Sequence, residues 1–298
     1  MSTADATQPA SVAAPRTRTR VRKRPRQGQH PVIWVAVIAI IIFCLLPFYW
    51  LINTSLKTGA DLSQSDWIPP HPSLKNYESI FKNDDFTNGL KNSAIVSLSV
   101  TVLALLFGSF AAYALARLKL RRKFLILGIV LSVTTFPGIA IAAPLFKLWS
   151  DIGLYNTRIG LIIPYLTFAL PLAIYILVSF FKEIPKDLEE AALVDGATHF
   201  QAFRKVVVPL AAPGLATAGI LTFIFAWNEF LLAITLTSST SARTVPAAIA
   251  FFTGSTQFEQ PLGTIAAASV VISIPLIVLV LLFQKRIVAG LTAGAVKG

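Results

Sequence analysis

Long apolar segments recur along this chain and alternate with shorter polar stretches. They cover residues 32–53, 92–116, 124–149, 158–181, 211–236 and 262–284. A helix rises by about 1.5 Å per residue, so each segment is long enough to cross a hydrocarbon core of about 30 Å. The pattern therefore predicts an all-α integral membrane protein with six transmembrane helices.

The composition agrees with a membrane protein. Of the 298 residues, 55% are hydrophobic and 13% are charged, against about 25% charged residues in soluble domains. Residues 1–30 are basic and contain few large apolar side chains. Such a segment cannot bury enough surface to offset the entropy of ordering, so we expect a disordered basic tail followed by one membrane domain at 31–298.

Basic residues are distributed unevenly between the loops. They are concentrated at 16–26 and in the loops that follow the second, fourth and sixth apolar segments. Because cytoplasmic loops carry an excess of Lys and Arg, both termini are predicted to be cytoplasmic. The 16–26 run has no interleaved aromatic residues and adjoins an apolar segment, which favours a topology signal over nucleic-acid binding. An added role in holding anionic lipid is compatible with this.

The sequence contains no pattern that indicates catalysis or a resident metal. It has neither a P-loop nor a dinucleotide-binding glycine run, and its three histidines, His30, His71 and His199, are scattered. We therefore expect no catalytic residue, no metal and no cofactor on this chain. Uphill transport would take its energy from a partner protein or from an ion gradient.

Pro137 and Gly138 interrupt the third segment, so a kink is expected there. Such kinks occur in bundles that enclose a pathway and also in transmembrane helices that do not transport anything.

Few polar residues fall within the apolar segments. Asn228 and Glu229 lie in the outer part of the fifth segment. They either line a path for a polar solute, or the Glu229 carboxylate lies near the interface or is paired within the bundle. So few charges make ion coupling the weaker model.

The loop at 182–210 is unusually long and charged. Asp187, Glu189 and Glu190 favour the first half of a short helix, and Gly196 supplies the left-handed position that ends it. A second short helix is expected from Ala197 to about Val206.

The side chains of this loop are suited to contact with another surface. Ala191 and Ala192 leave room for close approach, and Glu190 offers a carboxylate to an arginine. The alternative is a solvated surface hairpin.

The same loop carries a specific resemblance. Residues 190–209 resemble the signature of permease subunits of bacterial ABC importers, which is E-A-A, three residues, G, nine residues, then I-x-L-P, with Val206 and Val208 replacing Ile and Leu. Residues 195–198, 227–230 and 290–298 look like the carbohydrate branch, in particular its maltose-permease G-type subunits. The resemblance covers nearly everything after residue 30.

The resemblance implies a type I permease domain at 31–298 with a coupling loop at 182–210 and a cytoplasmic tail at 285–298. By position, the residues of the coupling helix would be Glu190, Ala191, Ala192, Asp195 and Gly196. This helix would dock on a cytoplasmic ATPase subunit, with Glu190 paired to an arginine there. ATP and Mg would bind to that ATPase.

The implied function is a permease subunit that imports a sugar, such as the disaccharides trehalose or maltose, by alternating access in a bacterial inner membrane. The implied partners are a homologous sister permease, two copies of an ATPase subunit, an extracytoplasmic solute-binding protein or lipoprotein, and membrane lipid; no nucleic acid is expected. Three alternatives remain: a permease for glycerol phosphate or an oligosaccharide, a stand-alone ion-coupled carrier, and a membrane scaffold.

The first external loop, from Thr54 to Lys91, is expected to fold as a small cap, used for interfacial anchoring or for docking.

Overall fold

The protein is described here by a computed structural model that covers residues 31–252 and 261–293. The described chain is helical and contains no strand. It divides into two compact units, Met1–Pro47 and Phe48–Gly298. The predicted tail at 1–30 and the last five residues of the predicted C-terminal tail lie outside the described residues.

Helices long and apolar enough to span a membrane make up most of the described chain. Four qualify alone: α1 (Pro31–Ser55), α3 (Asp84–Arg117), α6 (Arg158–Glu183) and the Leu262–Gln284 part of α13 (Leu262–Ala293). Two bent pairs qualify together: Lys123–Thr135 with Gly138–Asp151, bent by 84°, and His199–Leu210 with Ala212–Asn228, bent by 76°. If each bent pair is one span, the described residues contain up to six, which is the predicted number. The second pair, however, begins at His199, inside the loop predicted at 182–210, and not at 211 as the apolar segment predicts.

The third segment breaks at the predicted place. It consists of α4 (Lys123–Ser132), η2 (Val133–Thr135) and α5 (Gly138–Asp151). Phe136 is extended, with φ −70° and ψ 127°, because the ring of Pro137 disfavours the helical conformation in the residue before it.

The fifth apolar segment, predicted at 211–236, is interrupted as well. It consists of α10 (Ala212–Asn228) and α11 (Leu231–Leu236). Glu229, between them, is extended, with φ −66° and ψ 127°. The expectation that Glu229 lies within a helix was therefore wrong.

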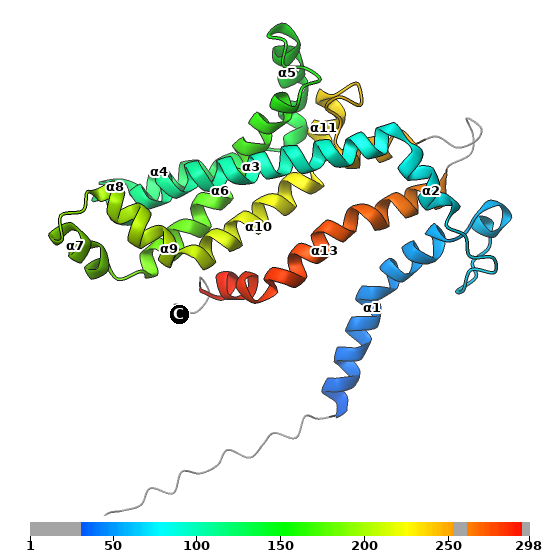
Figure 1. Ribbon diagram of the computed structural model, residues 1–298, viewed down its shortest axis with the longest axis horizontal. Helices are drawn as coiled ribbons and strands as arrows, with labels where there is room; N and C mark the ends of the chain where they lie inside the picture. The colour runs from blue at the N-terminus through cyan, green and yellow to red at the C-terminus, as the bar shows by residue number, and fades with distance from the viewer. Residues whose placement is uncertain (1–30, 253–260, 294–298) are drawn as a thin grey trace, which may run out of the picture. The chain divides into compact units, whose positions relative to one another are not determined.

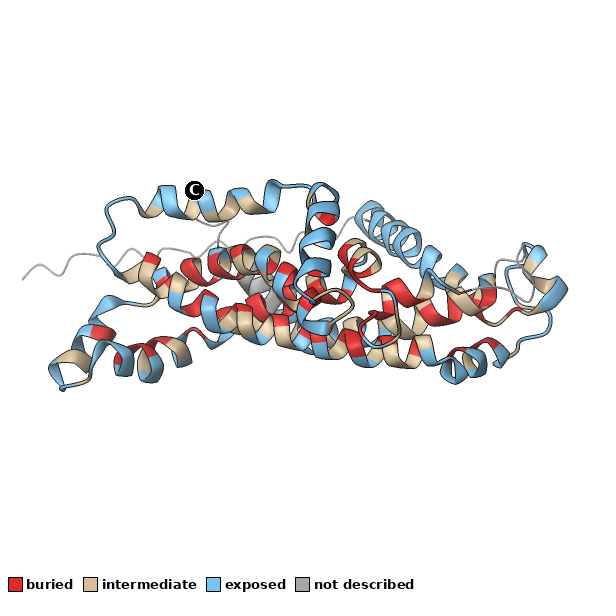
Figure 2. Cartoon of the chain, turned by 90° about the horizontal axis from the view of Figure 1, so that it is seen from above, coloured by how far each residue is buried: buried red, intermediate tan, exposed pale blue. Residues whose placement is uncertain are grey.

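The helices α3, α6 and α10 pack side by side, and α13 lies against α10 (Figure 1). Buried residues follow the facing sides of the packed helices (Figure 2). Two glycines permit close approach. A Cβ added at Gly108 of α3 would lie 3.4 Å from the Ala173 Cβ of α6, and one added at Gly214 of α10 would lie 2.3 Å from the Phe180 ring of α6. Small residues at such contacts are typical of membrane helices.

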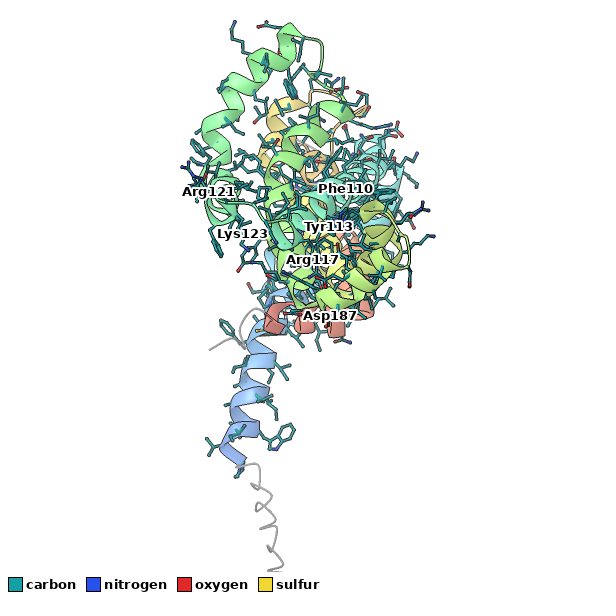
Figure 3. All side chains as sticks on the ribbon, turned by 90° about the vertical axis from the view of Figure 1, so that its left-hand side faces the viewer. Phe110, Tyr113, Arg117, Arg121, Lys123 and Asp187 are labelled. Atoms are coloured by element: carbon teal, nitrogen blue, oxygen red, sulfur yellow. The ribbon has the colours of Figure 1, made fainter. Side chains whose placement is uncertain are left out.

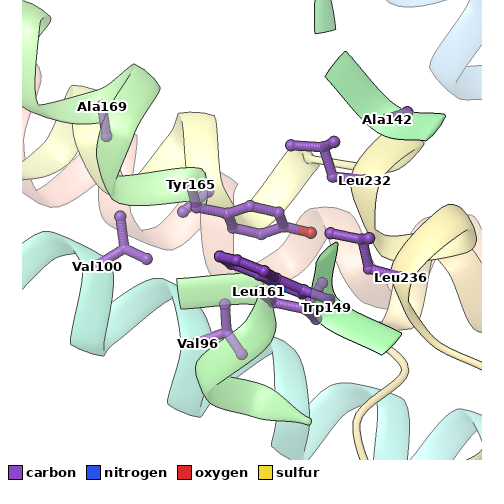
Figure 4. Close-up of a cluster of buried hydrophobic side chains, with 10 residues drawn as sticks. Val96, Val100, Ala142, Trp149, Leu161, Tyr165, Ala169, Leu232 and Leu236 are labelled. Carbon is purple, nitrogen blue, oxygen red and sulfur yellow. The ribbon is translucent and has the colours of Figure 1, made fainter. Parts of the chain in front are cut away.

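One cluster of the core joins α3, α5, α6, α10 and α11 (Figure 4). Its largest members, Trp149 and Tyr165, are buried together with Leu161. The Trp149 Nε1 donates to the Gly160 carbonyl oxygen at 2.7 Å. This bond satisfies the indole donor inside an apolar cluster, as buried tryptophans require.

The segment that follows α1 is a folded cap, as predicted. It contains η1 (Gly59–Ser63) and α2 (Lys75–Lys82). Lys57 is buried, and its Nζ donates to the carbonyl oxygens of Gln64 and Asp66, both at 2.9 Å. Asn76 is buried too, and its Nδ2 donates to the Lys57 carbonyl oxygen at 2.8 Å. These bonds hold residues 57–76 together as one folded segment.

Candidate functional site

The loop at 182–210 forms the end of the second unit opposite α2 (Figure 1). Its elements are α7 (Lys186–Val194), α8 (His199–Ala202), the π-helical turn η3 (Phe203–Val207) and α9 (Val208–Leu210). The second helix begins at His199 and not at Ala197 as expected. Thr198 caps it: the Gln201 N–H donates to the Thr198 Oγ1 at 3.2 Å, and the Thr198 N–H donates to the Gln201 Oε1 at 2.9 Å. This reciprocal pair is a capping box.

Gly196 ends α7, as the sequence predicts. Its φ is +88°, in the left-handed region that favours glycine. The Gly196 N–H donates to the Leu193 carbonyl oxygen and the Ala197 N–H to the Ala192 carbonyl oxygen, both at 3.0 Å. These two bonds define a Schellman motif, which satisfies the last carbonyls of the helix and fixes the direction of the chain that follows.

The predicted coupling residues lie together on this short helix and its turn. Glu190, Ala191, Asp195 and Gly196 are exposed, and Ala192 is half-buried. Large apolar side chains are exposed beside them: Leu188, Val194 and Phe200. A surface that combines exposed apolar groups with a carboxylate is typical of a contact with another protein.

Glu189, which the sequence analysis used only as a helix-favouring residue, is buried. Its carboxylate makes an ion pair with the Arg117 Nε at 3.2 Å and accepts a hydrogen bond from the Tyr113 hydroxyl. The Arg117 Nη2 donates to the Ile184 carbonyl oxygen at 2.9 Å. Figure 3 shows Tyr113 and Arg117 at this end of α3, with Asp187 of α7 nearby.

The sequence did contain a signal for this contact. Tyr113 and Arg117 are four residues apart at the end of the second apolar segment, so they share one helix face. Their partner is distant in sequence and could not be identified from spacing.

An aromatic cluster holds the second half of the loop. The Phe203 ring lies with its centroid 4.9 Å from that of Tyr113, 5.4 Å from Phe110 and 6.3 Å from Phe181. Phe203 is buried between α3 and α6 as a result. The π-helical turn at Phe203–Val207 therefore packs against α3 and α6 through Phe203.

A pocket of about 190 Å³ lies at the junction of α3 and α7. It is lined by Arg117, Lys119, Lys186, Glu189, Glu190, Leu193 and His199. The pocket places the buried Glu189 and the exposed Glu190 beside the same small cavity.

Asn228 and Glu229 lie far along α10 from the loop, and both make local bonds. The Asn228 side chain is exposed, and its Nδ2 donates to the Ile224 carbonyl oxygen at 2.8 Å. The Glu229 carboxylate accepts from the N–H groups of Leu232 at 2.8 Å and Ala233 at 3.1 Å. Glu229 therefore caps the start of α11, where a negative charge is favourable. This is a structural role that the sequence did not reveal.

The sequence analysis also missed a polar network at the other end of α3. The Asn92 Nδ2 donates to the carbonyl oxygens of Thr240 and Arg243, both at 2.9 Å, and its Oδ1 accepts from the Arg158 Nε at 2.8 Å. Asn156, with φ +58°, accepts the N–H groups of Ser238 and Ser239 on its Oδ1. These contacts fasten the chain after α11 to α3 and to the turn that precedes α6.

No group of three or more His, Cys, Asp or Glu side chains that could hold a metal ion occurs in the described part of the chain. His71 lies 3.3 Å from the Asp61 carboxylate on an exposed loop. Lys147, a charged residue within the third apolar segment, is exposed, and its Nζ lies 3.9 Å from the Asp151 carboxylate.

The packed apolar helices and the protruding polar loop define a multi-pass membrane protein of the transport permease class. The family described as "Binding-protein-dependent transport system inner membrane component" matches residues 104–292. The chain belongs to this family of inner membrane transport components.

Several curated relatives are similar over nearly the whole chain. The trehalose transport system permease protein of Mycobacterium tuberculosis is 54% identical over 89% of this chain and 97% of the relative. The sulfoquinovosyl glycerol transport system permease protein of Agrobacterium fabrum is 44% identical, covering 90% and 94%. The trehalose/maltose transport system permease protein of Thermococcus litoralis is 41% identical, covering 89% and 95%.

A solved structure supports the same fold. In the crystal structure of a bacterial ABC transporter involved in the import of the acidic polysaccharide alginate, one chain matches with a TM-score of 0.72 and 25% identity, over 87% of this chain and 97% of that chain. The resemblance to ABC importer permeases is thus confirmed for the family and the fold.

Proposed function

We propose that this chain is one of two permease subunits of an ATP-driven sugar importer and moves its cargo by alternating access. The observation that carries the proposal is the exposed face of α7, closed by the Gly196 turn at the end of the helical bundle. Such a rigid, protruding element is suited to transmit movement from a soluble partner to packed membrane helices.

In this proposal a cytoplasmic ATPase subunit is the soluble partner. Glu190 pairs with an arginine of that subunit, and Ala191 and Ala192 allow its surface to approach closely. ATP and Mg bind on the ATPase, which places the loop and both termini in the cytoplasm. The second permease, a second ATPase copy and an extracytoplasmic solute-binding protein or lipoprotein complete the importer.

The proposed cargo is a disaccharide such as trehalose or maltose. The names of the two relatives with trehalose or trehalose/maltose as cargo support it. Asn228, exposed at the end of α10, is proposed to offer its amide oxygen to a sugar hydroxyl. Glu229 takes part by fixing the α10–α11 break next to it.

The test is purification of the tagged chain from its native membrane in mild detergent, followed by mass spectrometry and an ATPase assay. Recovery of a second permease and an ATPase, with hydrolysis stimulated by sugar-loaded binding protein, is the expected result. A chain recovered alone would contradict the proposal. Stimulation by a panel of trehalose, maltose, a longer oligosaccharide and glycerol phosphate then identifies the cargo.

A further inference from the structure

We propose that Tyr113, Arg117 and Glu189 form a joint that makes α7 and α3 move as one body, and that this joint is distinct from the surface that binds the ATPase. The inference rests on the proposed function, in which α7 receives the movement. In this inference, the three positioning residues transmit that movement into the membrane helices.

The joint is buried and connects three elements. The side chains of Arg117 and Glu189 are 5% and 10% exposed. Arg117 contacts Glu189 of α7 and, through its Nη2, the Ile184 carbonyl oxygen at the end of α6. The Tyr113 hydroxyl donates to the second Glu189 oxygen. The ends of α3 and α6 and the start of α7 are thus tied by side chains that all point to one carboxylate.

Without this joint, α7 has few attachments to the membrane helices. It packs on α8 and η3, which belong to the same loop. It is preceded by Ile184 and Pro185, both extended, and followed by Gly196 at φ +88°. The Schellman turn sets the direction of the chain after α7 but does not attach the helix to α3, so a force on α7 can reach α3 only through side chains.

Burial makes this ion pair suitable for that task. Exposed pairs contribute little, because solvent screens them. The pairs Lys82–Glu78 and Lys147–Asp151 are of that kind, at 3.9 Å and exposed. The joint instead holds its charges out of water, where separation of either partner leaves an uncompensated buried charge. Movement that pulls α7 away is therefore opposed, and α3 follows.

The two consecutive glutamates have different roles in this proposal. Successive residues of a helix point in directions about 100° apart, so Glu189 faces the bundle while Glu190 faces outward. Loss of Glu190 should affect attachment of the ATPase. Loss of Glu189 should instead reduce the amount of sugar imported per ATP hydrolysed, while the ATPase stays attached.

The first test compares Glu189→Gln with the matched variant Glu190→Gln in the assembled importer. Glu189→Gln keeps the size of the side chain and an acceptor for Tyr113 but removes the charge. We expect it to retain the ATPase during purification and to import about tenfold less sugar per ATP hydrolysed, a change within the range of single coupling free energies. Glu190→Gln is expected to lose ATPase during purification instead.

A charge exchange separates transmission from simple stability. The double variant Arg117→Glu with Glu189→Arg restores an ion pair of reversed polarity, so sugar imported per ATP should recover relative to either single variant. Equal imports per ATP in Glu189→Gln and in the unaltered complex would overturn the inference, as would loss of ATPase from Glu189→Gln and Glu190→Gln alike.

A cross-link tests the joint without relying on the exchanged charges. Arg117→Cys with Glu189→Cys, in complexes lacking Cys44 and all other cysteines, can be bridged by a short reducible bis-methanethiosulfonate, because both positions line the same pocket. The bridged complex should transport, and reduction of the bridge should uncouple it. Transport blocked by the bridge would show that α3 and α7 must separate, which contradicts the joint. If the unaltered complex itself shows no ATP-driven uptake, the proposed function has failed and not only the joint.

Discussion

Residues of the same type have different environments in this protein, and their expected roles differ accordingly. Glu189 is buried in an ion pair, whereas its neighbour Glu190 is exposed at the edge of the same pocket. Gly196 and Gly128 are both free of neighbours within 4 Å of an added Cβ, but only Gly196 has a positive φ. These contrasts provide matched controls.

Glu190→Ala should loosen the attachment of the ATPase. Removal of one partner from an interfacial charged hydrogen bond costs about 2–5 kcal/mol, so the dissociation constant should rise by about thirtyfold or more. Binding of the purified ATPase to immobilised permease measures this. Glu183→Ala, which removes an exposed carboxylate at the end of α6, should leave binding unchanged. Equal binding by the unaltered protein and both variants would remove Glu190 from the interface.

Gly196→Val should disturb the turn after α7 without steric conflict, because no atom lies within 4 Å of the added Cβ. The left-handed conformation costs a residue with a Cβ about 1–2 kcal/mol, and more if it is β-branched. We expect reduced sugar-stimulated ATPase activity in a protein that is still inserted in the membrane. Gly128→Ala, within α4, is the control. Full stimulation in Gly196→Val would show that the turn does not orient α7 for coupling.

At the scale of elements, close helix contacts and polar fastenings give the bundle its shape. Gly214 lets α10 approach α6, and Asn92 fastens the chain after α11 to α3. The apolar pattern predicts neither contact, because it indicates which residues are kept from water and not which helices pack against each other.

Gly214→Ala should destabilise the contact between α6 and α10. The added Cβ would lie 2.3 Å from the Phe180 ring, and overpacking of this kind typically costs about 1–3 kcal/mol. Thermal unfolding in detergent should show a lower midpoint, partly restored by combining Gly214→Ala with Phe180→Ala. Gly219→Ala, whose added Cβ would have the end of the Leu105 side chain as its nearest neighbour at 3.1 Å, should have a smaller effect. A midpoint unchanged in Gly214→Ala would contradict the contact.

Asn92→Ala should release the chain at 237–245. It removes two donated bonds and the acceptor of the Arg158 Nε, and buried groups left without partners cost about 1–3 kcal/mol each. Hydrogen exchange should become faster at 237–245 while α6 stays protected. Asn228→Ala, whose amide bonds only within its own helix, is the comparison, and unchanged exchange in Asn92→Ala would refute the fastening.

At the scale of the whole molecule, hydrophobic pattern was sufficient for the class of fold. The sequence predicted the all-α bundle from its apolar segments, the break from Pro137 and the turn from Gly196, since each depends on local chemistry. It did not predict the break at Glu229 or the burial of Glu189. Both depend on contacts made only after folding: Glu229 accepts two N–H groups of α11, and Glu189 meets a helix that ends some 70 residues earlier.

The site could be predicted to the same extent. Sequence order located the 182–210 loop and its exposed residues, because the signature is contiguous. The residues that fasten this loop to the bundle, Arg117, Tyr113 and Phe203, come from different segments. The roles of Glu190 and of Asn228 remain predictions.

The central claim is that this chain moves sugar only when a partner hydrolyses ATP. The most direct test is uptake of radiolabelled trehalose into liposomes that contain the chain with its sister permease and ATPase, with the binding protein added. Uptake that requires ATP inside the liposomes and stops when the ATPase is omitted is the predicted result. Uptake by this chain alone, driven by a proton or sodium gradient, would contradict the account.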